Sequence, residues 1–115
     1  MTRGDVYWAD LSPRSGSEQQ GRRPIIVVSH DAFNRAPTWH SLVVVPISTS
    51  SSQAARGPTT VPLAPGSGGL RKPCYAVCHQ VTTLDRSKIL TRIGTLSRDS
   101  LTRVTAGLKA ALDLD

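Results

Sequence analysis

The sequence has few of the residues on which several common types of site depend. Only two of its 115 residues are cysteines, and its aromatic residues are two Trp, two Tyr and one Phe. Cys74 and Cys78 have only His79 beside them, which is poor spacing for a zinc site. On one strand through residues 74–80 they would lie about 13 Å apart, too far for a disulfide. We therefore expect two buried thiols acting as small hydrophobic side chains, with an intersubunit disulfide as the alternative.

Acidic residues are also scarce, and the best-known enzyme motifs are missing. The eight Asp and Glu residues are scattered along the chain, which argues against a magnesium site and hence against a two-metal nuclease. The chain has no Walker loop and no Gly-x-Gly-x-x-Gly, His-Glu-x-x-His or Gly-x-Ser-x-Gly motif. We expect neither a metal ion nor an organic cofactor.

No apolar run approaches the roughly 18 residues of a membrane span, and Met1 leads into Arg3-Gly4-Asp5 rather than into the apolar core of a signal peptide. We therefore expect a cytoplasmic protein. Fourteen Lys and Arg leave a net charge of +6, which favours a polyanionic partner, nucleic acid before an acidic membrane, with plain solubility as the alternative. The length fits a single domain, residues 1–115.

Short apolar runs separated by turn residues predict a mainly β fold. The expected strands are residues 6–11, 24–29, 42–47, a weak 59–63, 74–81 and 89–93. Pro24 fits only the first position of its strand, and Pro46 implies a sheet edge or a bulge. A short helical or irregular stretch is expected around residues 31–35 and a turn at 85–87, and Gly94 should end the last strand.

One clear helix is expected after Ser97, which is a natural N-cap, with Asp99 in the first turn. Its apolar stripe consists of Leu101, Val104, Leu108, Ala111 and Leu112. The fold class is therefore mainly β with a C-terminal helix, in which the helix packs on a small, strongly bent antiparallel sheet or SH3-like partial barrel.

Two long polar loops are candidates for function. Residues 14–23 contain no apolar side chain, and residues 64–72 form a glycine-rich segment, expected to be mobile, that carries Arg71 and Lys72. Arg23 stands where the first loop enters a buried strand, and its guanidinium fork matches two phosphate oxygens. Taken alone, Arg23 could equally be a solvated loop arginine like Arg22.

Four segments carry a family resemblance. The strings RGDVYWADLSP at residues 3–13 and GSEQQGRRP at 16–24 closely resemble the N-terminal signature of the MazF/PemK (Kid-like) toxin endoribonucleases. VVPISTS at 44–50 is similar to the family's strand that ends in a hydroxyl residue, and HQVTTLD at 79–85 to its acidic-Gln-x-x-Thr-x-Asp block. The resemblance implies a CcdB/MazF-type fold, a homodimer, ribosome-independent cleavage of single-stranded RNA at short sequences, and inhibition by an antitoxin whose disordered tail occupies the RNA groove.

The resemblance also implies catalytic residues. The family's Arg before Pro corresponds to Arg23, as charge stabiliser and possible proton donor, and its Thr at the strand exit corresponds to Ser48, with Thr49 as the alternative if the register slips by one. Ser48 keeps the hydroxyl of that Thr. His79 stands where the family has an acid before Gln80, and it could transfer a proton or simply be a polar strand residue.

Further side chains could bind RNA or pack the protein. The candidates for RNA contact are Glu18, Gln19 and Gln80 at base edges, Arg71 and Lys72 at phosphates, and His79. Ordinary solvation is the alternative for the two cations. Phe33 and Trp39 could stack on bases or pack an interface, whereas Tyr7 and Trp8 are expected in the core.

Without a metal ion, RNA cleavage would use the ribose 2′-hydroxyl as nucleophile, leaving a 2′,3′-cyclic phosphate and a 5′-hydroxyl. Two alternatives keep the same fold. One is a CcdB-like gyrase poison, which would place its binding residues on the C-terminal helix. The other is a catalytically silent RNA-binding module, for which His79 is the best argument.

Overall fold

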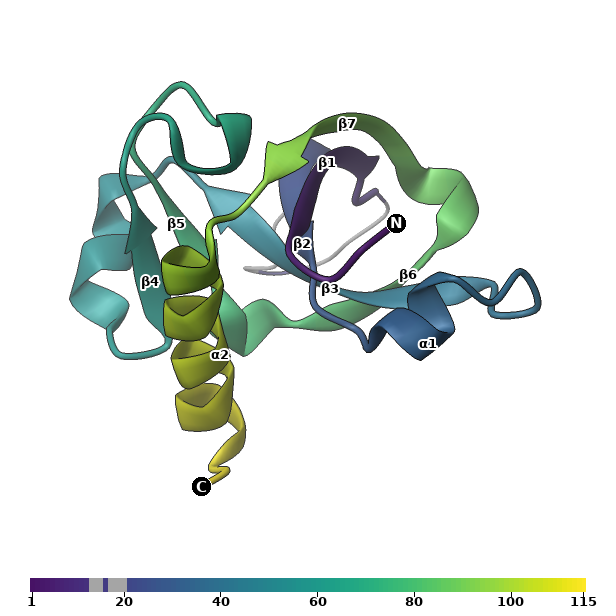
Figure 1. Ribbon diagram of the computed structural model, residues 1–115. Coiled ribbons are helices and arrows are strands. Elements are labelled where there is room, and N and C mark those ends of the chain that lie inside the picture. Colours follow the sequence, from purple (N-terminus) through teal and green to yellow (C-terminus); the bar gives the residue numbers. More distant parts are fainter. Residues whose placement is uncertain (13–15, 17–20) are drawn as a thin grey trace.

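The computed structural model describes residues 1–12, 16 and 21–115. Figure 1 shows the arrangement of its elements. The strands are β1 (Asp5–Asp10), β2 (Arg22–Val27), β3 (Ser41–Ser48), β4 (Thr60–Leu63), β5 (Cys74–Val77), β6 (Thr82–Asp85) and β7 (Ile89–Thr95). The helices are α1 (Asp31–Asn34) and α2 (Arg98–Leu112), with four 3₁₀ helices, η1 (Ser51–Arg56), η2 (Ser67–Gly69), η3 (Cys78–Gln80) and η4 (Arg86–Lys88).

The strands form one bent, unclosed antiparallel sheet with the order β4-β5-β3-β2-β1-β7, and β6 also pairs with β3 (Figure 1). Helix α2 lies against β4 and η3. This arrangement confirms the predicted fold class, a mainly β protein with a C-terminal helix packed on a small bent sheet. In the described part of the chain, no helix combines the length and the apolar character needed to cross a bilayer.

Strand β3 is the centre of the sheet, because it changes partner along one side. Its residues 41–44 pair with β6 and its residues 47–48 pair with β5, while β2 pairs with it on the other side. The expectation of a sheet edge at Pro46 is therefore wrong, and its alternative, a bulge, does not occur in the pairing with β2, whose register runs through Pro46 without a shift. Neither β5 nor β6 pairs with Pro46, so its missing N–H removes no hydrogen bond to those strands.

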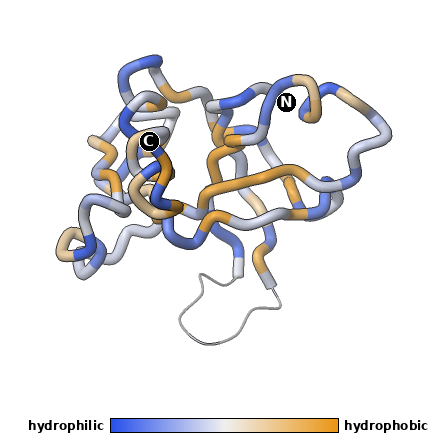
Figure 2. The backbone as a smooth tube through the Cα atoms, turned by 90° about the horizontal axis from the view of Figure 1, so that it is seen from below, coloured by the Kyte–Doolittle hydropathy of each residue, from blue (hydrophilic) through white to orange (hydrophobic). Residues whose placement is uncertain are grey.

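The bend of the sheet produces two hydrophobic clusters. Alternate residues of β2 point to opposite faces, so Ile26 packs in one cluster with Val104 of α2, and Ile25 and Val27 pack in the other with Leu84 of β6. All three β2 residues are fully buried, which confirms a strand covered on both faces. Figure 2 shows hydrophobic chain segments gathered toward the middle of the molecule.

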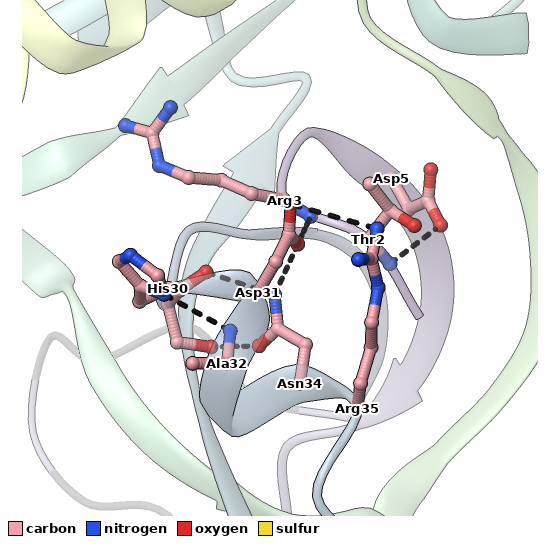
Figure 3. Close-up of polar contacts among 9 residues, drawn as sticks. Thr2, Arg3, Asp5, His30, Asp31, Ala32, Asn34 and Arg35 are labelled. Carbon is pink, nitrogen blue, oxygen red and sulfur yellow. Dashed lines mark hydrogen bonds and ion pairs between the residues drawn. The ribbon is translucent and has the colours of Figure 1, made fainter.

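Polar contacts fix the N-terminus beside α1 (Figure 3), and one further contact reaches α2. The backbone N–H of Arg3 donates to Asp31 Oδ1 at 2.7 Å, and the Arg3 guanidinium donates to the Val28 carbonyl and to Thr105 Oγ1. The Asn34 amide donates to the same Asp31 oxygen at 3.0 Å. The Arg3 N–H first, and the Asn34 amide second, hold the pKa of Asp31 below its usual value. These contacts set the entry of the chain into β1.

The segment predicted as one strand over residues 74–81 is interrupted. Strand β5 ends at Val77, η3 follows, and β6 is a further strand that the sequence did not predict. Cys78 therefore lies off the strand, and the 13 Å estimate does not apply. Both cysteines are nevertheless free and buried, as expected. Burial raises the pKa of both thiols, that of Cys78 to about 11.

Close backbone approach explains a second difference. Gly94 lies inside β7 and does not end it, and an ideal Cβ there would be 2.5 Å from the Gly68 carbonyl oxygen. Gly68 is buried in η2, where its own Cβ would meet Val6 and Leu96 at 2.8 and 3.0 Å. The two glycines thus let the predicted glycine-rich loop pack directly on β7.

Two smaller expectations are also corrected. Pro24 occupies the third position of β2, opposite Trp8, because pairing of β2 with β3 begins only at Ile25. The Ser97 side chain accepts the Ser100 N–H, which confirms the N-cap of α2. Leu112, however, is 53% exposed, because the last turn of α2 extends beyond the sheet (Figure 1).

Candidate functional site

A cavity of about 690 Å³ opens between the start of β2, the end of β3, the segment after η2, and strand β7. Its cationic lining residues are Arg22, Arg23, Arg71, Lys72 and Arg92. Within the described ranges, no Asp or Glu lines this cavity. A concave surface with cations on several sides concentrates positive potential and favours polyanionic ligands.

Arg23 is placed by the pairing of β1 with β2. It lies opposite Ala9 and is partly buried, whereas Arg22 lies opposite Asp10 and is exposed. Leu11 N–H donates to the Gly21 carbonyl at 2.9 Å, which extends the antiparallel pairing to the residue before β2. Arg23 therefore extends from a paired strand whose residues 25–27 are fully buried. Such a rigid strand can hold the guanidinium in one orientation toward a phosphate.

The two candidate hydroxyl residues have different environments. Ser48 is the last residue of β3, is 4% exposed, and accepts the backbone N–H of Ser50 on its Oγ at 3.1 Å. Thr49 is exposed and lines the cavity together with Arg23, whereas Ser48 is not among the lining residues. The geometry therefore brings Arg23 together with the alternative candidate, Thr49.

His79 and Gln80 lie on η3, outside the lining of the cavity. The Nδ1 atom of His79 is 3.0 Å from the Thr59 hydroxyl. Partial burial first, and the guanidinium of Arg56 second, lower the pKa of His79 below its usual 6.5. The imidazole is therefore mainly neutral at pH 7, and within this chain it does not face the Arg23 cavity.

Of the remaining candidates, Arg71 and Lys72 do line the cavity, as exposed residues between η2 and β5. Glu18 and Gln19 lie outside the residues that the structure describes. Across the described ranges, no group of three or more His, Cys, Asp or Glu residues is arranged to hold a metal ion.

Comparison with known proteins identifies the family. A family model described as PemK-like, MazF-like toxin of type II toxin-antitoxin system matches residues 2–112. The chain belongs to this toxin family. Endoribonuclease EndoA of Bacillus subtilis is 35% identical over 115 residues, which cover 99% of this chain and 96% of that protein.

Solved structures agree with this assignment. The toxin superposes on MazF from Deinococcus radiodurans with a TM-score of 0.80 at 25% identity, covering 99% of this chain and 97% of that one. It also superposes on an endoribonuclease from a mycobacterial species, in complex with its cognate antitoxin, with a TM-score of 0.75 at 25% identity and coverage of 100% and 95%.

Trp8 and Arg92 are among the lining residues of the toxin's cavity that sequence reasoning did not assign to a site. Trp8 is 43% exposed and lines the cavity, so the expectation that it packs in the core is wrong. Tyr7, by contrast, packs against a hydrophobic cluster. Adjacent residues of a strand point to opposite faces, so Tyr7 and Trp8 lie on different sides of β1, but the sequence alone does not say which side is covered.

The second is Arg92 of β7, which is held in position by an acidic partner. Its guanidinium lies 3.7 Å from Asp5 Oδ1 and donates to Thr95 Oγ1 at 2.5 Å, and the Thr95 hydroxyl donates to the same Asp5 oxygen at 2.8 Å. No motif marks Arg92, because only the pairing of β7 with β1 brings it to the cavity.

Proposed function

We propose that this toxin is an endoribonuclease that cuts single-stranded RNA at short, specific sequences without a metal ion. The observation that carries the proposal is the cavity that Arg23 and Thr49 both line, together with four further cations and, among the described residues, no acid. A polyanion fits such a surface. The relative from Bacillus subtilis, named an endoribonuclease, supports the same activity at 35% identity.

The ribose 2′-hydroxyl is the nucleophile in the proposed mechanism. Its oxygen loses a proton and bonds to phosphorus, the bond from phosphorus to the 5′-oxygen breaks, and the leaving oxygen takes up a proton. The products are a 2′,3′-cyclic phosphate and a 5′-hydroxyl. The protein positions the splayed backbone and stabilises the charge that develops on the phosphoryl oxygens.

Arg23 neutralises the charge at phosphorus, because a guanidinium donates two parallel hydrogen bonds and is a poor base. Thr49 supplies a hydroxyl donor in the same cavity. Ser48, which the resemblance made the first choice, supports Thr49 by accepting the Ser50 N–H and fixing the strand exit. Arg22, Arg71, Lys72 and Arg92 bind neighbouring phosphates, and Glu18, Gln19, Gln80 and His79 remain candidates for base contact.

The proposal includes two protein partners. A cognate antitoxin with an acidic segment would occupy the basic cavity and exclude RNA, as a toxin of this family requires, and its affinity should fall as salt rises. A second copy of the chain would form a homodimer, which is supported by the exposed apolar Leu112 and Leu114 at the C-terminal end. Residues 1–115 would act as one toxin domain in the cytoplasm, where messenger RNA is accessible.

A labelled RNA incubated with the toxin in excess EDTA tests this function. We expect discrete cuts with a cyclic phosphate end, and resistance of an RNA with a single 2′-deoxy substitution at the cut. Equal cutting of the deoxy substrate would overturn the intramolecular mechanism. Binding without cutting would indicate the silent RNA-binding module, and inhibition of gyrase supercoiling without cutting would indicate the gyrase poison.

A further inference from the structure

Trp8 is an exposed aromatic residue that lines the basic cavity. It lies on the central part of β1, opposite Pro24 of β2, and 43% of its surface is exposed. The neighbouring position, Ala9, is fully buried and pairs with Arg23. Trp8 and Arg23 thus stand one position apart on neighbouring strands, and both line the cavity.

The lining of the cavity contains both apolar and charged residues. The apolar ones besides Trp8 include Pro24, Ile47, Leu70 and Ile93. The cations of β2, β7 and the segment after η2 line the same space. A nucleotide has these two properties in one unit, a flat base that stacks and a phosphate that pairs with cations.

We propose that Trp8 stacks on a nucleobase of the bound RNA strand, next to the phosphate that Arg23 holds. This inference rests on the proposed function, and it adds the residue that positions the strand. Stacking accepts any base, because every base has a π-face. Trp8 is therefore a positioning residue that strengthens binding and orients the scissile phosphate, while base identity is read by other groups.

The other tryptophan provides a matched control. Trp39 is 48% exposed, close to the value for Trp8, but its ring packs at a tilt against Phe33 with centroids 4.3 Å apart, and it does not line the cavity. Trp39→Phe leaves Trp8 as the only tryptophan, and Trp8→Phe leaves only Trp39. Each variant then reports the environment of a single indole.

The first experiment measures tryptophan fluorescence with a 2′-O-methylated oligonucleotide of random sequence, which lacks the free 2′-hydroxyl needed for cleavage. We expect saturable quenching in Trp39→Phe and none in Trp8→Phe. The result that overturns the inference is an unchanged Trp8 signal at saturating oligonucleotide, or quenching only by an acidic peptide. The fluorescence result tests stacking by Trp8 whether or not the protein cuts RNA. If the oligonucleotide quenches Trp8 but no RNA is cut, the proposed function is wrong and the stacking inference remains.

The second experiment measures kcat/KM for cleavage. Trp8→Leu should lose about 10- to 100-fold, Trp8→Phe should retain most activity, and Trp39→Leu should stay within about twofold of the unaltered toxin. Substrates with one abasic position at a time should include one on which Trp8→Leu and the unaltered toxin cut equally. If the unaltered toxin cuts RNA and Trp8→Leu has the same kcat/KM as Trp39→Leu, the stacking inference is wrong, while the proposed nuclease function is still supported. Equal melting temperatures of the two variants exclude misfolding as the cause.

Discussion

Arg86 is predicted to hold the loop between α1 and β3. Its Nε donates at 2.5 Å and its terminal nitrogen at 3.0–3.1 Å to backbone carbonyls, those of Phe33, Asn34, Ala36 and Trp39. The side chain at position 86 therefore replaces the secondary structure that this loop lacks. We expect Arg86→Ala to destabilise the protein and to release the exposed aromatic pair.

The size of the destabilisation expected for Arg86→Ala follows from the number and the exposure of these hydrogen bonds. A hydrogen bond to a charged donor contributes roughly 1.5–3 kcal/mol. One terminal nitrogen has only two hydrogens for three carbonyls, and two of the four bonds are solvent-exposed. We therefore expect a loss of about 2–3 kcal/mol, which in a domain of this size lowers the melting temperature by about 8–12 °C.

Arg35 provides the matched control, and the assay is thermal melting followed by circular dichroism. The Arg35 side chain is 69% exposed and makes one ion pair of 4.0 Å with Asp31. Such a pair contributes under about 1 kcal/mol, so Arg35→Ala should change the melting temperature by only a few degrees. Arg86→Lys should behave like Arg86→Ala, because a lysine cannot reproduce the fork. Equal melting temperatures for Arg35→Ala and Arg86→Ala would refute this reasoning.

Three further predictions concern pH and packing. By NMR titration, His79 should have a pKa below 6.5, because burial disfavours its charged form; a value above 6.5 would contradict this environment. Gly107→Leu should lower the free energy of unfolding in urea by about 1–3 kcal/mol, since even a Cβ there would lie 2.8 Å from the Cys78 sulfur, while Ala106→Leu on the exposed side should change it by less than about 0.5 kcal/mol. The contacts that lower the pKa of Asp31 stabilise the fold at pH values above its usual 3.8, and this stabilisation is lost as pH falls through the lower folded value. Asp31→Asn should therefore make the melting temperature fall less steeply at acidic pH. An unchanged acidic pH dependence would contradict this prediction.

The strand pattern was predictable where local sequence decides it. Residues Ile25, Ile26 and Val27 read as a strand buried on both faces, and Ser97 as an N-cap, and both readings are confirmed. The break at η3 was not predictable, since no Gly or Pro interrupts residues 74–85. It arises because β5 and β6 pair with different halves of β3, and this pairing is determined by tertiary contacts rather than by local sequence.

The site was predictable in part. The motif around Arg23 and the cations Arg71 and Lys72 were identified from the sequence, and the fold brings them to one cavity. Which hydroxyl enters that cavity was not predictable, because it depends on how the chain leaves β3 after Ser48. Trp8 was assigned to the core, because hydrophobicity alone does not distinguish the two faces of a strand.

The most direct test of the account compares Arg23 with its neighbour Arg22, because both line the cavity and only Arg23 is assigned to the reacting phosphate. The measurement is single-turnover cleavage of a short labelled RNA at saturating protein, which removes binding from the comparison. Arg23→Ala should lower the rate by on the order of 10² or more, and Arg23→Lys should remain impaired, because the interaction is strongest in the transition state. Arg22→Ala should cut at nearly the unaltered rate once saturated. Equal single-turnover rates for Arg22→Ala and Arg23→Ala, with both variants folded, would contradict the assignment.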